Sequence, residues 1–377
     1  MIDTLALTLR QDMFQITNPE KFTPSAQWIE NYGKSMHGMK SKQNPTKKEL
    51  LHGIYKPRLT LSYCFTNART RELMLRIELS LPKLLYGNNF DELQYKDFKP
   101  LVQKLATTLE TMGVIVSTDT LAQAPVCAIH YSKNIALTDG SIPFSYINKI
   151  KEANARLSLD TNESTYRNEG HGYKWHCNAY EVAFYDKIKD LEKAKQSSKL
   201  TIEKDSELQL SIIDAFAHRH HLEYLRMEVR LNKREMIKRL LKKLNIKSNL
   251  TFKSLFKPAI AKKVLLYYLH EIERNRLPLL DFKAKNDQAL LAALRINNPQ
   301  LNPKQILQMF GLKKSLELYT IRELRNLFCK CSPRSWYRLM ANAKKINLPA
   351  TESSLSVLRE SIEKLKPSKL STIKEIR

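Results

Sequence analysis

No apolar run in this sequence approaches the roughly 20 residues needed to span a bilayer. Its opening residues, Met1 to Leu9, lack the positive charge that begins a secretory signal. The 5 cysteines are odd in number and scattered, which favours reduced thiols over a disulfide framework. These absences argue against a membrane role and predict a cytoplasmic protein.

Acidic residues are also scarce relative to basic ones. The chain has 63 Lys and Arg against 38 Asp and Glu, which gives a net charge of +25 and a pI near 9.7. A net charge this positive favours the binding of a polyanion, because binding releases the polyanion's condensed counterions. With 42% hydrophobic residues the chain can still build a core. DNA or RNA is therefore the leading class of ligand.

The 377 residues are enough for about two domains, and their patterns change near residue 240. Residues 1–240 mix strand and helix patterns, whereas 241–377 read as almost entirely helical. We expect an α+β domain with a mostly antiparallel central sheet and flanking helices, followed by an all-helical domain. The main signals are a hairpin at 58–65 and 72–81 with a turn at 66–70, helices at 101–113 and 144–157, and strands at 126–132, 165–185 (two, joined near Gly170 and Gly172) and 225–231.

One alternating segment, residues 180–187, ends in a tyrosine with a lysine two positions later. Residues i and i+2 of a strand share a face, so Tyr185 and Lys187 would place a phenol beside a cation. Such a pair could attack a phosphodiester, since a nearby cation favours the phenolate. A sheet tyrosine with a solvated lysine is the plainer alternative. Alternation turns Tyr180 to the opposite face, where we expect packing or DNA contact.

Three predicted strands each carry one acidic or imidazole group among polar residues. These groups are Glu78, His130 and Glu228, and on neighbouring strands they could hold a divalent metal ion beside Tyr185. Alternatively, the two glutamates pair with arginines on an exposed face, as such residues usually do. The partners would then be Arg76, Arg226 or Arg230.

Several segments, in order along nearly the whole chain, resemble the rolling-circle replication initiators of filamentous phages and related plasmids, which are related to the His-hydrophobe-His endonucleases. These segments are Met1 to Leu9, Arg76 to Gly87, Ile129 to Ser132, Val182 to Lys187, Leu225 to Arg230 and Ser332 to Arg338. The resemblance implies an enzyme that nicks and rejoins one strand of origin DNA. It departs from the related endonucleases at Ser132, which stands where a second histidine would be expected.

The resemblance also implies roles for individual residues. Tyr185 matches the nucleophile that would form a 5′-phosphotyrosine, and Lys187 is our candidate to stabilise its phenolate. Glu78, Glu228 and His130 match positions that would bind Mg²⁺ or Mn²⁺. The implied partners are supercoiled duplex DNA with a single-stranded nick site, and a helicase and polymerase of a bacterial host, in whose cytoplasm the protein would act.

Other histidines are weaker candidates for the site. His218, His220 and His221 would fan out from a helix, which favours phosphate contact or solvent exposure over metal binding. His171 and His176 flank the turn before Tyr185. For both, an ordinary surface or packing role is the more common outcome.

The C-terminal part predicts binding rather than chemistry. Asn302-Pro303 and Ser332-Pro333 are typical helix starts, and an apolar stripe begins at Trp336. A helix-turn-helix with the helix at 321–328 would present basic residues to DNA, although any amphipathic surface helix fits nearly as well. The candidate DNA-binding residues are Arg334, Arg338, Lys344 and Lys345, and a basic tail follows from Lys364 to Arg377.

Two other classes of protein compete with the nickase. A DNA-binding replication factor or transcription regulator without catalysis would need neither Tyr185 nor a metal. A tyrosine recombinase would carry its nucleophile in a helical domain with several arginines, and it would cleave in the presence of a chelator.

Overall fold

The computed structural model describes residues 1–35, 38–46, 48–49, 52, 54–65, 71–153, 163–190, 223–329, 332–349 and 354–369. Its centre is a nine-stranded sheet, antiparallel throughout, in the order β3-β4-β5-β1-β7-β11-β10-β9-β8. The strands are β1 (Ile2–Arg10), β3 (Lys40–Gln43), β4 (Arg58–Phe65), β5 (Arg71–Ser80), β7 (Val126–Ala136), β8 (Glu163–Arg167), β9 (Gly172–His176), β10 (Tyr180–Asp186) and β11 (Tyr224–Leu231). The predicted α+β fold is confirmed.

The sheet reproduces most of the sequence signals. β4 and β5 form the predicted hairpin, while its turn at 66–70 lies outside the described residues. The predicted strand at 126–132 continues to Ala136 as β7. The region 165–185 contributes parts of three strands rather than two, because the chain reverses once around Gly170 and again between His176 and Tyr180.

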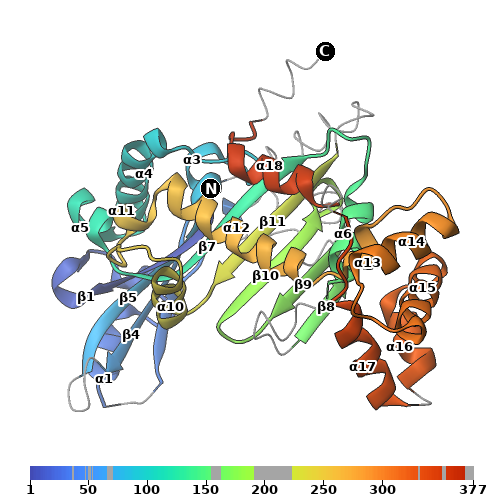
Figure 1. The fold of residues 1–377 in the computed structure, drawn as a ribbon. Coiled ribbons are helices and arrows are strands. Elements are labelled where there is room, and N and C mark those ends of the chain that lie inside the picture. Colours follow the sequence, from blue (N-terminus) through green and yellow to red (C-terminus); the bar gives the residue numbers. More distant parts are fainter. Residues whose placement is uncertain are drawn as a thin grey trace.

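One face of the sheet is apolar and is covered by helices. Buried residues such as Leu5, Ile77, Ile129 and Val229 alternate with polar neighbours, as a half-buried antiparallel sheet requires. Figure 1 shows α12 and α18 lying across the strands. The helices of this part are α1 (Ala26–Tyr32), α3 (Leu81–Tyr86), α4 (Phe98–Thr111), α5 (Thr118–Gln123), α6 (Pro143–Lys151), α10 (Arg234–Lys243), α11 (Phe252–Leu255), α12 (Pro258–Arg274) and α18 (Ser356–Lys364). A small second sheet pairs β2 (Gln15–Ile16) with β6 (Val114–Ile115).

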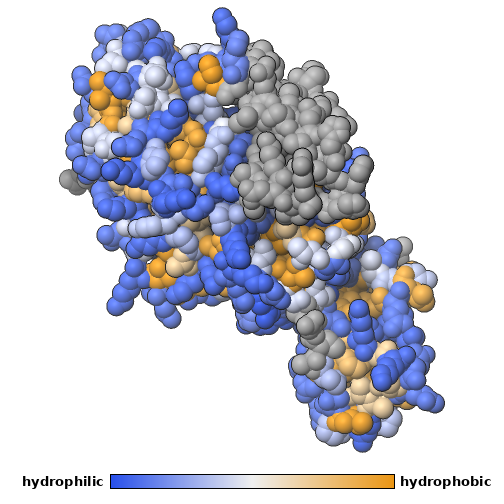
Figure 2. Space-filling view, turned by 90° about the horizontal axis from the view of Figure 1, so that it is seen from above, coloured by the Kyte–Doolittle hydropathy of each residue, from blue (hydrophilic) through white to orange (hydrophobic). Residues whose placement is uncertain are grey.

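A second hydrophobic core belongs to a group of five helices. They are α13 (Pro278–Asp281), α14 (Asp287–Asn297), α15 (Pro303–Leu318), α16 (Ile321–Cys329) and α17 (Pro333–Ala343). Leu294, Met309 and Trp336 are among their buried residues. This group projects from the main body, and hydrophilic side chains cover much of the visible face (Figure 2).

The two cores do not divide the chain at residue 240, where we predicted the domain boundary. The main core includes Leu240 of α10 and Val264 of α12, and the second core begins at Leu277. Amphipathic helices α10 and α12 belong with the sheet because their buried faces cover it. α18 returns to the same core through Leu358 and Ile362.

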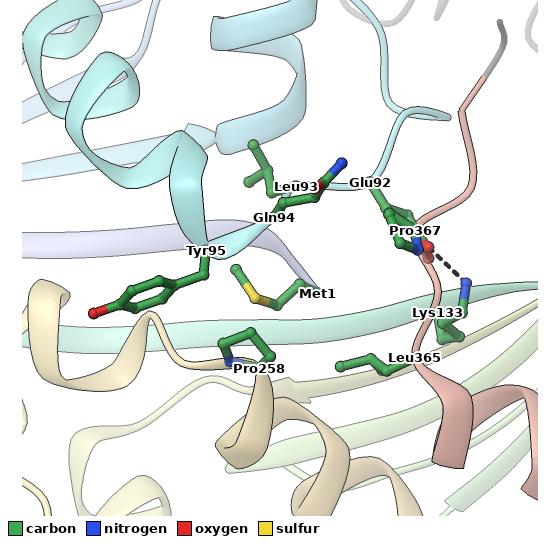
Figure 3. Close-up of a pocket in the computed structure, with 9 residues that line it drawn as sticks. All are labelled: Met1, Glu92, Leu93, Gln94, Tyr95, Lys133, Pro258, Leu365 and Pro367. Atoms are coloured by element: carbon green, nitrogen blue, oxygen red, sulfur yellow. Dashed lines mark hydrogen bonds and ion pairs between the residues drawn. The ribbon is translucent and has the colours of Figure 1, made fainter. Parts of the chain in front are cut away.

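The segment that follows α18 is held to the main body next to a buried ion pair. Lys133 Nζ lies 2.6 Å from Glu92 Oε2, and both side chains are almost completely buried. The backbone N–H of Glu92 donates to the carbonyl of Ser368 at 3.0 Å, while the N–H of Ser368 donates to the Glu92 carboxylate at 2.9 Å. Figure 3 shows this pair beside a small cavity of about 110 Å³ that Met1 also lines. Glu92, Lys133 and Ser368, which are far apart in the sequence, thus belong to one folded unit.

Candidate active site

The strand register brings polar residues together on the face opposite the apolar one. Directly paired residues of neighbouring strands share a face. Tyr185 of β10 pairs with Arg226 of β11, and Glu228 of β11 pairs with Ser132 of β7. The central strands of the sheet therefore assemble the candidate site.

Tyr185 lies on this face, near the end of β10. Its hydroxyl donates a hydrogen bond of 3.1 Å to Glu228 Oε2. Burial, and then the negative charge of Glu228, raise the pKa of the Tyr185 phenol well above its usual range. Tyr180 lies on the opposite face, where it is buried against Tyr268 with 5.7 Å between ring centres. The predicted separation of the two tyrosines is confirmed, and Tyr180 is a packing residue.

Glu228 is a buried carboxylate held by two arginines. Only 2% of its side chain is exposed, and Oε2 lies 3.0 Å from Arg230 Nη2 and 4.0 Å from Arg226 Nε. Burial alone would raise its pKa, but the charges of Arg230 and Arg226 outweigh this and hold the pKa of Glu228 well below its usual range. Glu228 is thus an ionised acceptor for the Tyr185 hydroxyl.

The guanidinium of Arg226 is fixed by side chains from distant parts of the sequence. Its Nη2 lies 2.9 Å from Asp3 Oδ1 and donates to Ser132 Oγ at 3.0 Å. Its Nη1 donates to Asn134 Oδ1 at 2.9 Å. Ser132, which stands where a His-hydrophobe-His pair would have its second histidine, is therefore an arginine partner here.

Lys187 does not reach the site by strand alternation. β10 ends at Asp186, whose Oδ1 accepts the backbone N–H groups of Ile188 and Lys189, and the chain becomes helical. Lys187 is only 1% exposed, and its Nζ donates to Asn89 Oδ1 at 3.0 Å. Burial and then the charge of Arg226 lower the pKa of Lys187 to about 8. The alternative of a solvated lysine is excluded.

Two of the three predicted metal ligands meet. His130 Nδ1 lies 3.6 Å from Glu228 Oε1, and His130 Nε2 is 3.1 Å from Asn232 Oδ1. Burial lowers the pKa of His130, although the charge of Glu228 opposes that shift. A neutral imidazole next to a carboxylate is the donor pair that a divalent ion needs.

Glu78 stands apart from this pair. It shares the polar face but forms an ion pair with Arg76 at 3.2 Å, and 46% of its side chain is exposed. Within the described ranges, no three His, Cys, Asp or Glu side chains are grouped to hold a metal ion. The arrangement at Glu78 is the surface ion pair that we considered as the alternative. Mg²⁺ is commonly bound by one or two carboxylates plus substrate phosphate, and Glu228 supplies one such carboxylate, whereas the imidazole of His130 is a softer ligand.

The remaining histidines lie outside the cluster around Tyr185 or outside the described residues. His171 Nδ1 lies 3.4 Å from Asp186 Oδ2, and the His171 ring packs against Phe144. His176 stands opposite Glu181 in the register of β9 and β10. His218, His220 and His221 belong to the part of the chain that the structure does not describe.

The four candidate DNA-binding residues of the C-terminal part are exposed. Arg334 and Arg338 lie on α17, and Lys344 and Lys345 follow its end. α17 packs on α16, with the rings of Phe328 and Trp336 stacked 6.1 Å apart. The predicted helix starts are confirmed, since the side chains of Asn302 and Ser332 accept backbone N–H groups as N-caps. DNA contact by these residues stays a prediction.

Asn89 is a site residue that the sequence patterns missed. Its side chain accepts from Lys187, and its backbone carbonyl accepts from Arg226 at 3.4 Å. Asn89 thus joins Lys187 to Arg226, the residue that pairs with Tyr185 in the register of β10 and β11. It follows Gly87, which has a φ of +75° at the end of α3, in a loop where hydrophobic periodicity carries no signal.

Comparisons with protein-family models, with curated proteins and with solved structures find no match to this chain. Among the described residues, no helix combines the length and hydrophobicity needed to cross a membrane.

Proposed function

We propose that this protein nicks and rejoins one strand of DNA at a replication origin, with Tyr185 as the nucleophile. The observation that carries the proposal is the 3.1 Å hydrogen bond from the Tyr185 hydroxyl to Glu228. A nucleophile whose proton already points at a carboxylate has the geometry required for base-assisted attack. The net charge of +25 supports a polyanionic substrate.

The reaction exchanges one phosphoester for another. The Tyr185 oxygen forms a bond to phosphorus as the proton passes to Glu228. The bond from phosphorus to the 3′ oxygen breaks, and that oxygen leaves with its electron pair and takes up a proton. The 5′ phosphate remains on the tyrosine, so the later attack of a 3′ hydroxyl rejoins the strand without ATP.

Arg230 couples substrate binding to the basicity of Glu228. Its side chain is 34% exposed and bridges Glu228 and Glu181, the latter at 2.9 Å. A scissile phosphate that draws Arg230 away removes a positive charge from Glu228. The carboxylate then becomes a stronger base when substrate is present. Arg226, held by Asp3, remains to orient Glu228.

A divalent ion is the second part of the proposal: it would be held by His130 and by Glu228 Oε1, the oxygen that faces His130, while Oε2 accepts from Tyr185. Mg²⁺ or Mn²⁺ would offset the charge that develops on the phosphate and the departing oxygen. Lys187 would add positive charge near the reacting atoms when it is protonated. Glu78 would not belong to this set, because it is paired with Arg76.

The test uses supercoiled DNA from the native replicon with Mg²⁺ or Mn²⁺, analysed by denaturing electrophoresis. We expect nicked circles with protein attached to one strand. The Tyr185→Phe variant should form no adduct yet bind DNA within about twofold of wild type, because the phenol hydroxyl is a reacting group and not a main source of binding. A DNA-binding replication factor without catalysis would give binding and no nick with either protein.

A further inference from the structure

A basic groove lies beyond the end of the strand that carries Glu228. It is bounded by α10 and by the loop at residues 245–250, and its volume is about 620 Å³. Arg234, Lys238, Lys242 and Lys247 line it, all exposed, with Glu235 as the one carboxylate among the lining residues. We infer that this groove binds the phosphate backbone of the DNA that flanks the cleavage site, an inference that rests on the proposed function.

The spacing of the cations fits a row of phosphates. Arg234, Lys238 and Lys242 recur every four residues and so lie on one face of α10. At 1.5 Å per residue they span about 12 Å. A strand of B-DNA carries one phosphate per about 3.4 Å of axis, so about three to four phosphates pass along this row. Lys247 provides a further cation from the loop.

These cations are available to a ligand. In the part of the chain that the structure describes, none of the four forms an ion pair with a carboxylate, whereas Lys314 on α15 is paired with both Asp287 and Glu317. Unpaired lysines along one groove repel one another. A polyanion relieves that repulsion and releases counterions when it binds.

Both walls of the groove are fixed to the sheet. α10 packs through Met236, Ile237 and Leu240, which are buried in the main core. The loop is anchored where the carbonyl of Leu250 accepts the backbone N–H of Val126 of β7 at 2.9 Å. The groove therefore exists before the ligand arrives, which reduces the entropic cost of binding.

The position of the groove relates it to the candidate active site. Figure 1 shows α10 beside the end of β11. Arg234 follows Glu228 by six positions, so the first groove cation lies within about 20 Å of Glu228 at 3.3 Å per residue. Asn232, in the connection between them, contacts His130. α10 packs on the apolar face of the sheet and Tyr185 lies on the polar face, so DNA bound at Tyr185 would pass round the end of β11 to reach the groove.

The experiment compares Lys238→Gln/Lys242→Gln with Lys96→Gln/Lys99→Gln, which removes two exposed charges near α4. Affinity for origin duplex is measured by fluorescence anisotropy over a series of salt concentrations. The groove variant should lower the slope of log affinity against log salt by about 2, since each phosphate contact contributes about 0.9. The control variant should lower this slope by less than half of the amount that one phosphate contact contributes. Equal slopes for the two variants would overturn the inference.

A second measurement separates the groove from the chemistry. Origin duplexes are shortened on one side of the nick site or on the other. For the wild-type protein, shortening should reduce affinity on one of the two sides only. For the groove variant, shortening that same side should leave affinity unchanged. Equal flank dependence in wild type and groove variant would also overturn the inference. Cleavage by saturating protein should remain within about twofold of wild type for the control variant Lys96→Gln/Lys99→Gln. If no protein cleaves DNA, the proposed chemistry fails, while the binding data still decide the groove.

Discussion

The Tyr185 hydroxyl and the Glu228 carboxylate are joined by a 3.1 Å hydrogen bond between neighbouring strands β10 and β11. The same carboxylate is the common partner of Arg226, Arg230 and His130. One acidic side chain therefore organises the whole polar cluster. Its charge matters both for the stability of the sheet and for the proposed reaction.

Replacing the Glu228 carboxylate should lower both the stability of the protein and its cleavage activity. Glu228→Gln leaves two buried or partly buried arginines without their common partner, and breaking such a pair costs about 3–5 kcal/mol. Loss of the base should also reduce strand cleavage by about 10²–10⁴-fold. Urea unfolding and single-turnover cleavage measure the two effects. Glu78→Gln is the matched control for stability, and its half-exposed pair with Arg76 should cost less than about 1 kcal/mol. Similar losses for both variants would contradict this account.

Lys187 should make stability depend on pH in the alkaline range. Burial lowers its pKa from 10.5 to about 8, so between these pH values the unfolded chain binds more protons than the folded one. The contribution of Lys187 to the free energy of unfolding therefore rises as the pH increases from about 8 to 10.5, and it is absent below about pH 8. Relative to Lys187→Met, the wild-type protein should gain about 3 kcal/mol between pH 8 and 10.5.

The measurement is urea unfolding of both proteins across that range, with Lys189→Met as an exposed neighbouring control. The control should follow the wild-type pH dependence. Parallel curves for wild type and Lys187→Met would show that the buried amine is not titrating as described. Cleavage should also fall above about pH 8 in wild type, as Lys187 loses its charge, and this fall should be missing in Lys187→Met.

Metal binding should depend on the pair that the structure brings together and not on the residue that stands apart. Mn²⁺ titration followed by electron paramagnetic resonance should show at least tenfold weaker binding for His130→Ala and for Glu228→Gln. Glu78→Gln should bind within about twofold of wild type, because Glu78 is engaged with Arg76. Equal weakening in all three variants would restore the three-ligand centre predicted from the sequence.

The sequence was informative where periodicity determines structure. Alternation predicted the strand at 72–81, whose Leu73, Leu75, Ile77 and Leu79 are buried on one face of β5, and it turned Tyr180 away from Tyr185, as the structure confirms. It failed at Lys187 because the Asp186 side chain caps a helical turn there and ends the strand. The contacts of Asp3 and Asn89 depend on long-range pairing of β1, β7 and β11, which spacing along one segment does not contain. The same reason explains why Glu78 and Glu228, equivalent in the sequence, have different partners.

The most direct test of the central claim is to identify the residue that carries DNA. The protein is incubated with supercoiled DNA of its native replicon and Mn²⁺, digested with nuclease and protease, and analysed by mass spectrometry. We predict a nucleotide phosphate on the peptide that contains Tyr185, and none on that peptide in the Tyr185→Phe variant, with Tyr180→Phe as the same-strand control that retains the adduct. An adduct on another residue, or one that persists in Tyr185→Phe, would contradict the account.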